Sequence, residues 1–178
     1  MQTEYLPNII SVFNQYRTLA KLTIFQLDED DFFYKPDSES NSVAIIMRHV
    51  AGNMISRRTN FLTTDGEKPD HNRDVDFEQG YLAMRKLMHH WEHGWQVFIN
   101  KLQSLKPNDL QKTIYIRSKA HSVMEAINRQ LAHYSYHIGQ MVFLTKHIKN
   151  IDTMAFGRKS LSIPKGKSQD FNNEKMGK

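Results

Sequence analysis

The stretch that decides the fold is residues 77–105, FEQGYLAMRKLMHHWEHGWQVFINKLQSL. Its apolar side chains recur at alternating steps of four and three residues: Phe77, Tyr81, Met84, Met88, Trp91, Trp95, Phe98, Leu102 and Leu105. This period places all of them on one face of an α-helix. Because the stripe repeats every seven residues, the helix is predicted to pack at a shallow angle against antiparallel neighbours in a bundle.

Three further helices are expected around this one. The first has an inward apolar seam over residues 6–27, and the second runs over residues 43–63 after a cap at Asn41 or Ser42. The last, residues 122–149, opens with Ser-Val-Met-Glu, a capping box in which serine and glutamate each satisfy a free backbone donor. The predicted fold class is therefore all-α: a four-helix bundle with long connections after helices two and three.

The connections are marked by polar residues, proline and glycine. The acidic run at residues 28–31 is interpreted as a polar exit from the first helix, and residues 29–41 as a connection. Residues 65–76 are predicted to form a loop long enough to cross the bundle. The β-leaning run at residues 113–116, Thr-Ile-Tyr-Ile, fits either a short strand or an extended strap.

The composition fits one globular domain over residues 1–149. The chain has 178 residues, of which 39% are hydrophobic, and it has no cysteine. Disulfides and thiolate metal ligands are therefore excluded, so any metal must be held by histidine or carboxylate. No apolar run reaches the roughly 18 residues of a membrane-spanning helix, and the N-terminus lacks the pattern of a signal peptide. A cytoplasmic protein without a membrane partner is expected.

The net charge of +5 is concentrated at the C-terminal end. Residues 150–178 contain six basic and three acidic side chains, a net charge of +3, which leaves +2 for the rest of the chain. This segment is predicted to be a basic, partly flexible tail. Because only two aromatic residues, Phe156 and Phe171, accompany its basic ones, no nucleic-acid partner is expected.

Nine histidines are the unusual chemical feature, and they include two His-x-x-x-His pairs, His89/His93 and His133/His137. Four-residue spacing puts both rings of either pair on one helix face, so spacing does not distinguish the pairs. Direction does. At about 100° per residue, His89 and His93 lie opposite the Trp91 seam and are predicted to face solvent, whereas His133 and His137 fall within the apolar arc of their helix.

Two inward imidazoles need partners, because burying them without hydrogen bonds costs several kcal/mol. His49 lies at the edge of the inward face of helix two, where the surrounding core positions make exposure unexpected. His49, His133 and His137 are therefore candidate ligands of a metal ion that keeps one or more positions for water or substrate. Three imidazoles suit a divalent Zn²⁺ or Ni²⁺ ion and exclude an all-oxygen magnesium or calcium site.

The alternative is a set of structural histidines. In that case His133 and His137 would be satisfied by Gln130, Gln140 or Tyr134, and His49 would only lie at a helix edge. Among the other histidines, surface positions are expected for residues 71, 90 and 147, and a structural or supporting role for residue 121. A solvated helix face is the preferred interpretation of the basic pair at positions 57 and 58, over a role in receiving an anionic substrate.

Two segments resemble the DinB/YfiT-like superfamily of four-helix-bundle metalloproteins. They are SVAIIMRHVAGN at residues 42–53 and QLAHYSYHIGQ at residues 130–140. The resemblance covers roughly residues 4–149 and looks closest to an uncharacterised bacterial branch. It implies that His49, His133 and His137 bind a divalent metal. It also implies a small-molecule substrate, for which a thiol is one candidate, and a homodimer, because such bundles often form dimers.

The resemblance leaves two classes of function open, because one scaffold hosts several chemistries. The first is a metal-dependent hydrolase or a transferase that uses a low-molecular-weight thiol, with the ion as Lewis acid. The second is a non-catalytic metal-binding or stress-response protein in which the ion is structural or sensory. No carboxylate is placed convincingly as a general base: Glu125 lies in the first turn of the last helix, and Glu92 lies off the seam of helix three.

Overall fold

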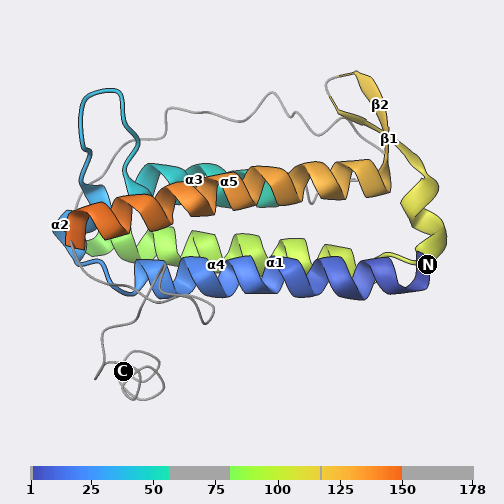
Figure 1. The fold of residues 1–178 in the computed structure, drawn as a ribbon, viewed down its shortest axis with the longest axis horizontal. Coiled ribbons are helices and arrows are strands. Elements are labelled where there is room, and N and C mark those ends of the chain that lie inside the picture. The colour runs from blue at the N-terminus through green and yellow to red at the C-terminus, as the bar shows by residue number, and fades with distance from the viewer. Residues whose placement is uncertain (1, 57–80, 117, 150–178) are drawn as a thin grey trace, which may run out of the picture.

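A computed structural model describes residues 2–56, 81–116 and 118–149, and these are mostly helical (Figure 1). In chain order the described elements are the helices and strands α1 (Gln2–Ile24), α2 (Glu29–Phe33), α3 (Val43–Ser56), α4 (Tyr81–Ser104), the 3-10 turn η1 (Pro107–Gln111), β1 (Thr113–Ile116), β2 (Lys119–Ser122) and α5 (Val123–Lys149). The expectation of a predominantly helical protein is confirmed. The predicted end of the second helix near Thr63, the loop at 65–76 and the tail at 150–178 lie outside the described residues.

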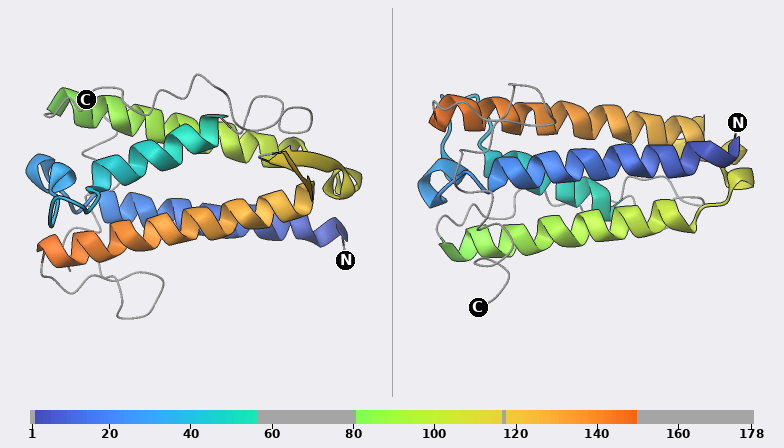
Figure 2. Two further views of the ribbon diagram at one scale, coloured as in Figure 1. Left: turned by 90° about the horizontal axis from the view of Figure 1, so that it is seen from above. Right: turned by 60° about the horizontal axis from the view of Figure 1, so that its bottom comes forward.

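The four longer helices lie side by side and differ in direction (Figures 1 and 2). Helices α1 and α5 run one way, and α3 and α4 run the other. The closest packing is between α3 and α4 and between α1 and α5, with fewer contacts between the two pairs. The expectation that α4 packs on antiparallel neighbours is therefore wrong for its main partner, because α3 points the same way. Two consecutive helices that run the same way need a long connection between them, and the loop predicted at residues 65–76 is expected to be long enough to cross the bundle.

The predicted seam of α4 forms much of the core. Trp91 and Trp95 are fully buried, and Phe13 and Tyr134 join them in edge-to-face aromatic contacts. On the same helix, Gly94 lets α3 approach closely, because a Cβ atom built there would lie 3.2 Å from both the Cα and the carbonyl oxygen of Ala51. The seam residues therefore pack through their side chains, and at Gly94 the backbones of α3 and α4 approach each other closely.

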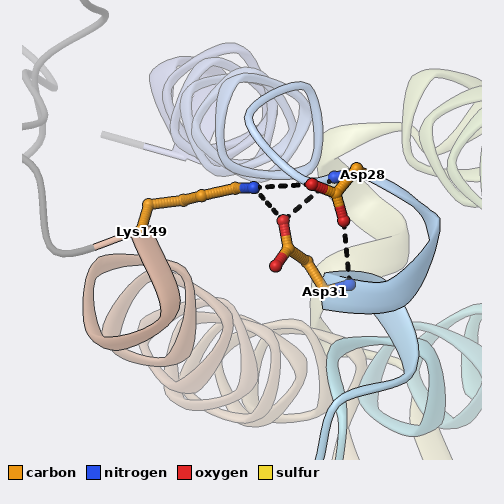
Figure 3. Close-up of polar contacts among 3 residues, drawn as sticks. All are labelled: Asp28, Asp31 and Lys149. Carbon is orange, nitrogen blue, oxygen red and sulfur yellow. Dashed lines mark hydrogen bonds and ion pairs between the residues drawn. The ribbon is translucent and has the colours of Figure 1, made fainter.

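The acidic run after α1 is not only an exit, which corrects the prediction of an irregular connection over residues 29–41. Asp28 caps helix α2 through its side chain, which accepts from the backbone of Asp31, and the Asp31 side chain accepts from the backbone of Asp28. Phe32 is buried and anchors this turn to the core. At the end of α5, Lys149 donates to the carboxylates of Asp28 and Asp31, which ties the last turn of α5 to the start of α2 (Figure 3).

The segment before α5 is a short antiparallel hairpin, which decides between strand and strap in favour of a strand at Thr113–Ile116. Ile114 and Ile116 are buried, so this strand covers one end of the helices. The hairpin leads directly into α5, and the predicted capping box is confirmed: Ser122 Oγ accepts from the backbone of Glu125 at 3.1 Å, while the Glu125 carboxylate accepts from the backbone of Ser122 at 2.7 Å. Among the described helices, none combines the length and the hydropathy of a membrane span.

Candidate metal centre

Three histidines from two helices meet at one point between α3 and α5. The Nε2 atom of His133 lies 3.1 Å from Nε2 of His49 and 3.1 Å from Nε2 of His137. One ligand atom from each of the three rings lies within 4.8 Å of the other two, and this is the one such group of three or more potential ligands among the described residues. The structure therefore brings together the three histidines that the sequence singled out.

The separations are those of a shared ion. Two imidazole nitrogens that each lie about 2.05 Å from one metal are ~3.3 Å apart in a tetrahedral shell and ~2.9 Å apart in an octahedral one. The two 3.1 Å separations around His133 fall between these values. The ligand atoms of the remaining pair, His49 and His137, lie within 4.8 Å of each other. The donor set consequently fits a divalent ion of the type that imidazole prefers.

The site lies at the rim of the helical core, which corrects the expected depth of His49. That side chain is exposed, whereas His133 and His137 are partly buried. The reason is angular: each ring is one residue, about 100°, away from a fully buried neighbour, namely Val50, Tyr134 and Ile138 respectively. The position of a residue around its helix predicts the direction of its side chain correctly, and it does not predict how deeply that side chain is buried.

A hydrogen bond fixes the orientation of His137. Its Nδ1 atom lies 2.8 Å from Oε1 of Gln140, one turn further along α5. A carbonyl oxygen only accepts, so Nδ1 carries the proton and, in the neutral ring, Nε2 keeps its lone pair toward His133. Burial lowers the pKa of His137 below its ordinary value, and the bond to Gln140 partly opposes this. The net effect favours the neutral ring, which is the form that binds metal.

A hydrogen bond between Tyr134 and Asn53 joins α5 to α3 close to the site. Tyr134 is fully buried, and its hydroxyl donates to Oδ1 of Asn53 at 3.1 Å. Asn53 lies one turn beyond His49 on α3, and Tyr134 follows His133 on α5. This contact therefore helps to set the spacing between His49 and the two histidines of α5.

The structure supports only part of the alternative interpretation, in which the histidines are structural. Gln140 does serve as a partner of His137, as that interpretation expected. The buried Oε1 of Gln130, in contrast, has no hydrogen-bond partner within the described structure, and the Tyr134 hydroxyl is directed to Asn53. The bond from Gln140 is made at Nδ1 of His137 and that of Tyr134 at Asn53, so neither of these two bonds is made to the Nε2 atoms that meet at His133.

Among the described residues, the other histidines do not join the group of three. His89 and His93 are exposed on α4, as predicted, and His147 is exposed and stacks on Phe143. His90 is partly buried, and its pKa is lowered by burial and then by His93 and His89. His121 is in β2 opposite Ile114. The histidine at position 71 and the arginines at 57 and 58 lie outside the described residues.

Comparison with known sequence families gives a match over most of the chain. The sequence family described as protein of unknown function, DUF1572, matches residues 1–167. The chain belongs to the DUF1572 family. No curated protein and no solved structure matches it.

In this DUF1572 protein, the two helices that carry the candidate ligands, α3 and α5, are poor in carboxylates. Helix α3 has none, and the single acid of α5, Glu125, is held by Ser122 in the capping box, which lowers the pKa of its carboxyl group. On α4, Glu92 accepts from Arg17 at 2.5 Å. Three imidazoles without a free carboxylate on α3 or α5 would leave the charge of a bound cation uncompensated by these helices.

Sequence reasoning missed two contacts that shape the site. One is the Asn53–Tyr134 bond, which joins positions 81 residues apart. The other is the hydrogen bond from Nε2 of Gln140 to the Tyr136 hydroxyl at 3.2 Å. The four-residue spacing of Tyr136 and Gln140 on one helix is a signal that would have suggested the second contact. Nothing local in the sequence signals the first.

Proposed function

We propose that this protein is a DinB/YfiT-like metalloprotein with a four-helix-bundle fold, in which His49, His133 and His137 bind one divalent ion, Zn²⁺ or Ni²⁺. The observation that carries the proposal is the meeting of three Nε2 atoms around His133, at separations suited to one ion. The chemistry of the donor set supports it, because imidazole is a preferred ligand of both metals.

The proposed role is catalytic. Within the described residues, no fourth protein ligand joins the group, and His49 is exposed, so a small molecule can approach from solvent. Three protein ligands with an open position are typical of catalytic rather than structural zinc sites. A bound ion would supply Lewis acidity, either to activate water for hydrolysis or to bind a low-molecular-weight thiol for transfer. The protein's own residues would hold the ligand rings and fix their tautomers.

A non-catalytic role in metal binding or stress response is the second candidate, and one observation favours it. The two carboxylates considered as general bases are both engaged elsewhere, Glu125 in the helix cap and Glu92 with Arg17. General acid–base catalysis needs a group within hydrogen-bond reach of the reacting atoms. A metal-binding or sensory protein needs no such base, whereas a hydrolase does.

Metal analysis tests the proposal. Protein purified without a nickel column is expected to contain about one divalent ion per chain, or to take up one from added Zn²⁺. Thiol-conjugation and ester or amide hydrolysis screens, with His133→Ala as the inactive control, then separate the two candidates. Activity that survives this substitution would eliminate the catalytic role, and failure of the wild type to bind Zn²⁺ would eliminate both.

A further inference from the structure

A chain of hydrogen bonds extends from the back of His137 to the protein surface. Nδ1 of His137 lies 2.8 Å from Oε1 of Gln140, and Nε2 of the same amide donates to the Tyr136 hydroxyl at 3.2 Å. The Tyr136 ring also lies against the imidazole, with centroids 5.1 Å apart. The three residues all belong to α5, so the rigid helix fixes their relative positions.

The direction of these bonds decides which imidazole nitrogen is available. A neutral ring has one N–H group, and the hydrogen bond made by one nitrogen sets the state of the other. Here the acceptor oxygen of Gln140 places the proton on Nδ1 and the lone pair on Nε2, the atom that faces His133. The other tautomer would point an N–H group into the candidate site and would not ligate an ion.

The amide of Gln140 can act in two ways, because its oxygen accepts and its nitrogen donates. Turned over, the same side chain would offer its NH₂ group to Nδ1 and favour the tautomer that cannot bind metal. In the structure the NH₂ group is held by the Tyr136 hydroxyl, away from the imidazole. Tyr136 thereby holds the far end of the amide in place.

We propose that Gln140 is the positioning residue of the metal centre: it holds His137 in the Nδ1–H tautomer that presents Nε2 to the ion, with its amide oriented by Tyr136. This inference rests on the proposed metal site and adds to it a residue that is not a ligand. Partners that hydrogen-bond to ligating histidines commonly change metal affinity 10- to 100-fold when they are removed, because they fix the tautomer and the ring orientation.

Three substitutions separate tautomer control from simple packing. Gln140→Leu keeps the size and removes the acceptor, so Zn²⁺ affinity is expected to fall about 10- to 100-fold. Gln140→Glu keeps an acceptor and removes the NH₂ group that could turn toward Nδ1. The Zn²⁺ affinity of this variant is therefore expected to equal or exceed that of the wild type. Tyr136→Phe removes only the support of the amide, and a loss of a few-fold is expected. Gln96→Leu is the matched control, because Gln96 bonds to Asn100 on the exposed face of α4.

The experiment combines Zn²⁺ competition titrations with ¹⁵N NMR of the histidine rings in the metal-free protein, and circular dichroism monitors folding. The wild type, Gln140→Glu and Gln96→Leu are expected to show the Nδ1–H form of His137, and Gln140→Leu a mixture of tautomers. An unchanged tautomer and unchanged affinity in Gln140→Leu would overturn the inference. Equal losses of affinity in the Leu and Glu variants would also overturn it, because that result indicates packing alone.

The same data distinguish this inference from the proposed function. A wild type that binds Zn²⁺ while Gln140→Leu leaves both measurements unchanged would refute the positioning role and leave the metal site standing. A wild type that binds no Zn²⁺, yet loses the Nδ1–H form of His137 on Gln140→Leu substitution, would refute the proposed function while supporting tautomer control by Gln140.

Discussion

The two His-x-x-x-His pairs of this protein have the same spacing and opposite surroundings. His133 and His137 lie beside the buried ridge of α5 and face His49 of α3. His89 and His93 are exposed on α4, and within the described structure they belong to no group of three potential ligands. The comparison shows that four-residue spacing supplies only half of a site. The other half is a third ligand on a facing helix.

The electrostatic surroundings of the pairs differ as well. On α4 a third histidine, His90, lies between the pair, and its pKa is lowered by burial and further by the charges of His93 and His89. These rings repel one another when protonated and do not converge on one point. At the α5 pair, the bond to Gln140 orients His137, and His133 lies between the other two rings.

The largest expected effect comes from removing one member of each pair. His133→Ala removes the central ligand and is expected to weaken Zn²⁺ binding at least 100-fold, about 2.7 kcal/mol. The double variant His89→Ala/His93→Ala is expected to bind Zn²⁺ as the wild type does. Isothermal titration calorimetry or chelator competition measures both. Equal losses in the two proteins would refute the distinction between the pairs.

The next effect tests whether helix spacing determines the site. Gly94→Ala places a methyl group 3.2 Å from the backbone of Ala51, so α3 must shift, at a cost of about 1–3 kcal/mol of unfolding free energy. Because His49 is also on α3, Zn²⁺ affinity should fall too. Gly139→Ala is the control: its added Cβ meets nothing within 4 Å, and removing a glycine from a helix should stabilise by up to about 1 kcal/mol. Urea unfolding and Zn²⁺ titration measure the stability and affinity of both variants. Equal changes in the two proteins would contradict the claim that the approach of α3 to α4 determines the site.

A smaller effect is expected from the bond between the two ligand-bearing helices. Tyr134→Phe removes the hydroxyl that donates to Asn53, at an expected cost of about 1 kcal/mol in unfolding free energy. Zn²⁺ affinity is expected to fall a few-fold, because the spacing of His49 from α5 becomes less well defined. The exposed α4 pair has no part in this bond. Unchanged affinity despite a measurable loss of stability would show that Asn53 and Tyr134 do not position the site.

The smallest effect concerns the far end of α5 and depends on pH. The hydrogen bond from Lys149 is the main reason that the pKa of Asp28 is lowered from 3.8 to about 2. This contact therefore stabilises the folded state fully above about pH 4, and the contribution is lost as the pH falls toward 2. Because Asp28 is largely exposed, the contribution should be well below 1 kcal/mol.

Lys149→Met tests this contact. The variant is expected to be slightly less stable than the wild type at pH 5–7, with the difference shrinking below pH 4, and to bind Zn²⁺ normally. A stability difference that persists unchanged at pH 2 would contradict the assignment. Urea unfolding at several pH values measures it.

Local patterns in the sequence predicted much of the fold. The seven-residue apolar repeat located α4, and the Ser122–Glu125 capping box fixed the start of α5. The same patterns failed where tertiary contacts decide. Helix α2 forms in an acidic run because Asp28 and Asp31 cap it and Phe32 is buried, and the direction of α3 relative to α4 depends on packing.

The candidate site shows the same division. Helical direction separated the inward pair from the exposed pair, because direction depends only on the residue count along one helix. The exposure of His49 and the Asn53–Tyr134 bond depend on how α3 lies against α5, which no local pattern records. The role of Gln140 lies between these cases: the sequence indicated a possible partner, and only the structure shows its oxygen at Nδ1 of His137.

X-ray absorption at the zinc edge, on protein loaded with one equivalent of Zn²⁺, tests the central claim most directly. Three imidazole nitrogens at about 2.0–2.1 Å are predicted, together with at least one further ligand, such as a water oxygen, that histidine does not supply. The same spectrum is predicted for His89→Ala/His93→Ala, and one imidazole fewer for His133→Ala. A wild-type shell with two imidazoles or fewer, or a shell lost in the His89→Ala/His93→Ala protein, would contradict it.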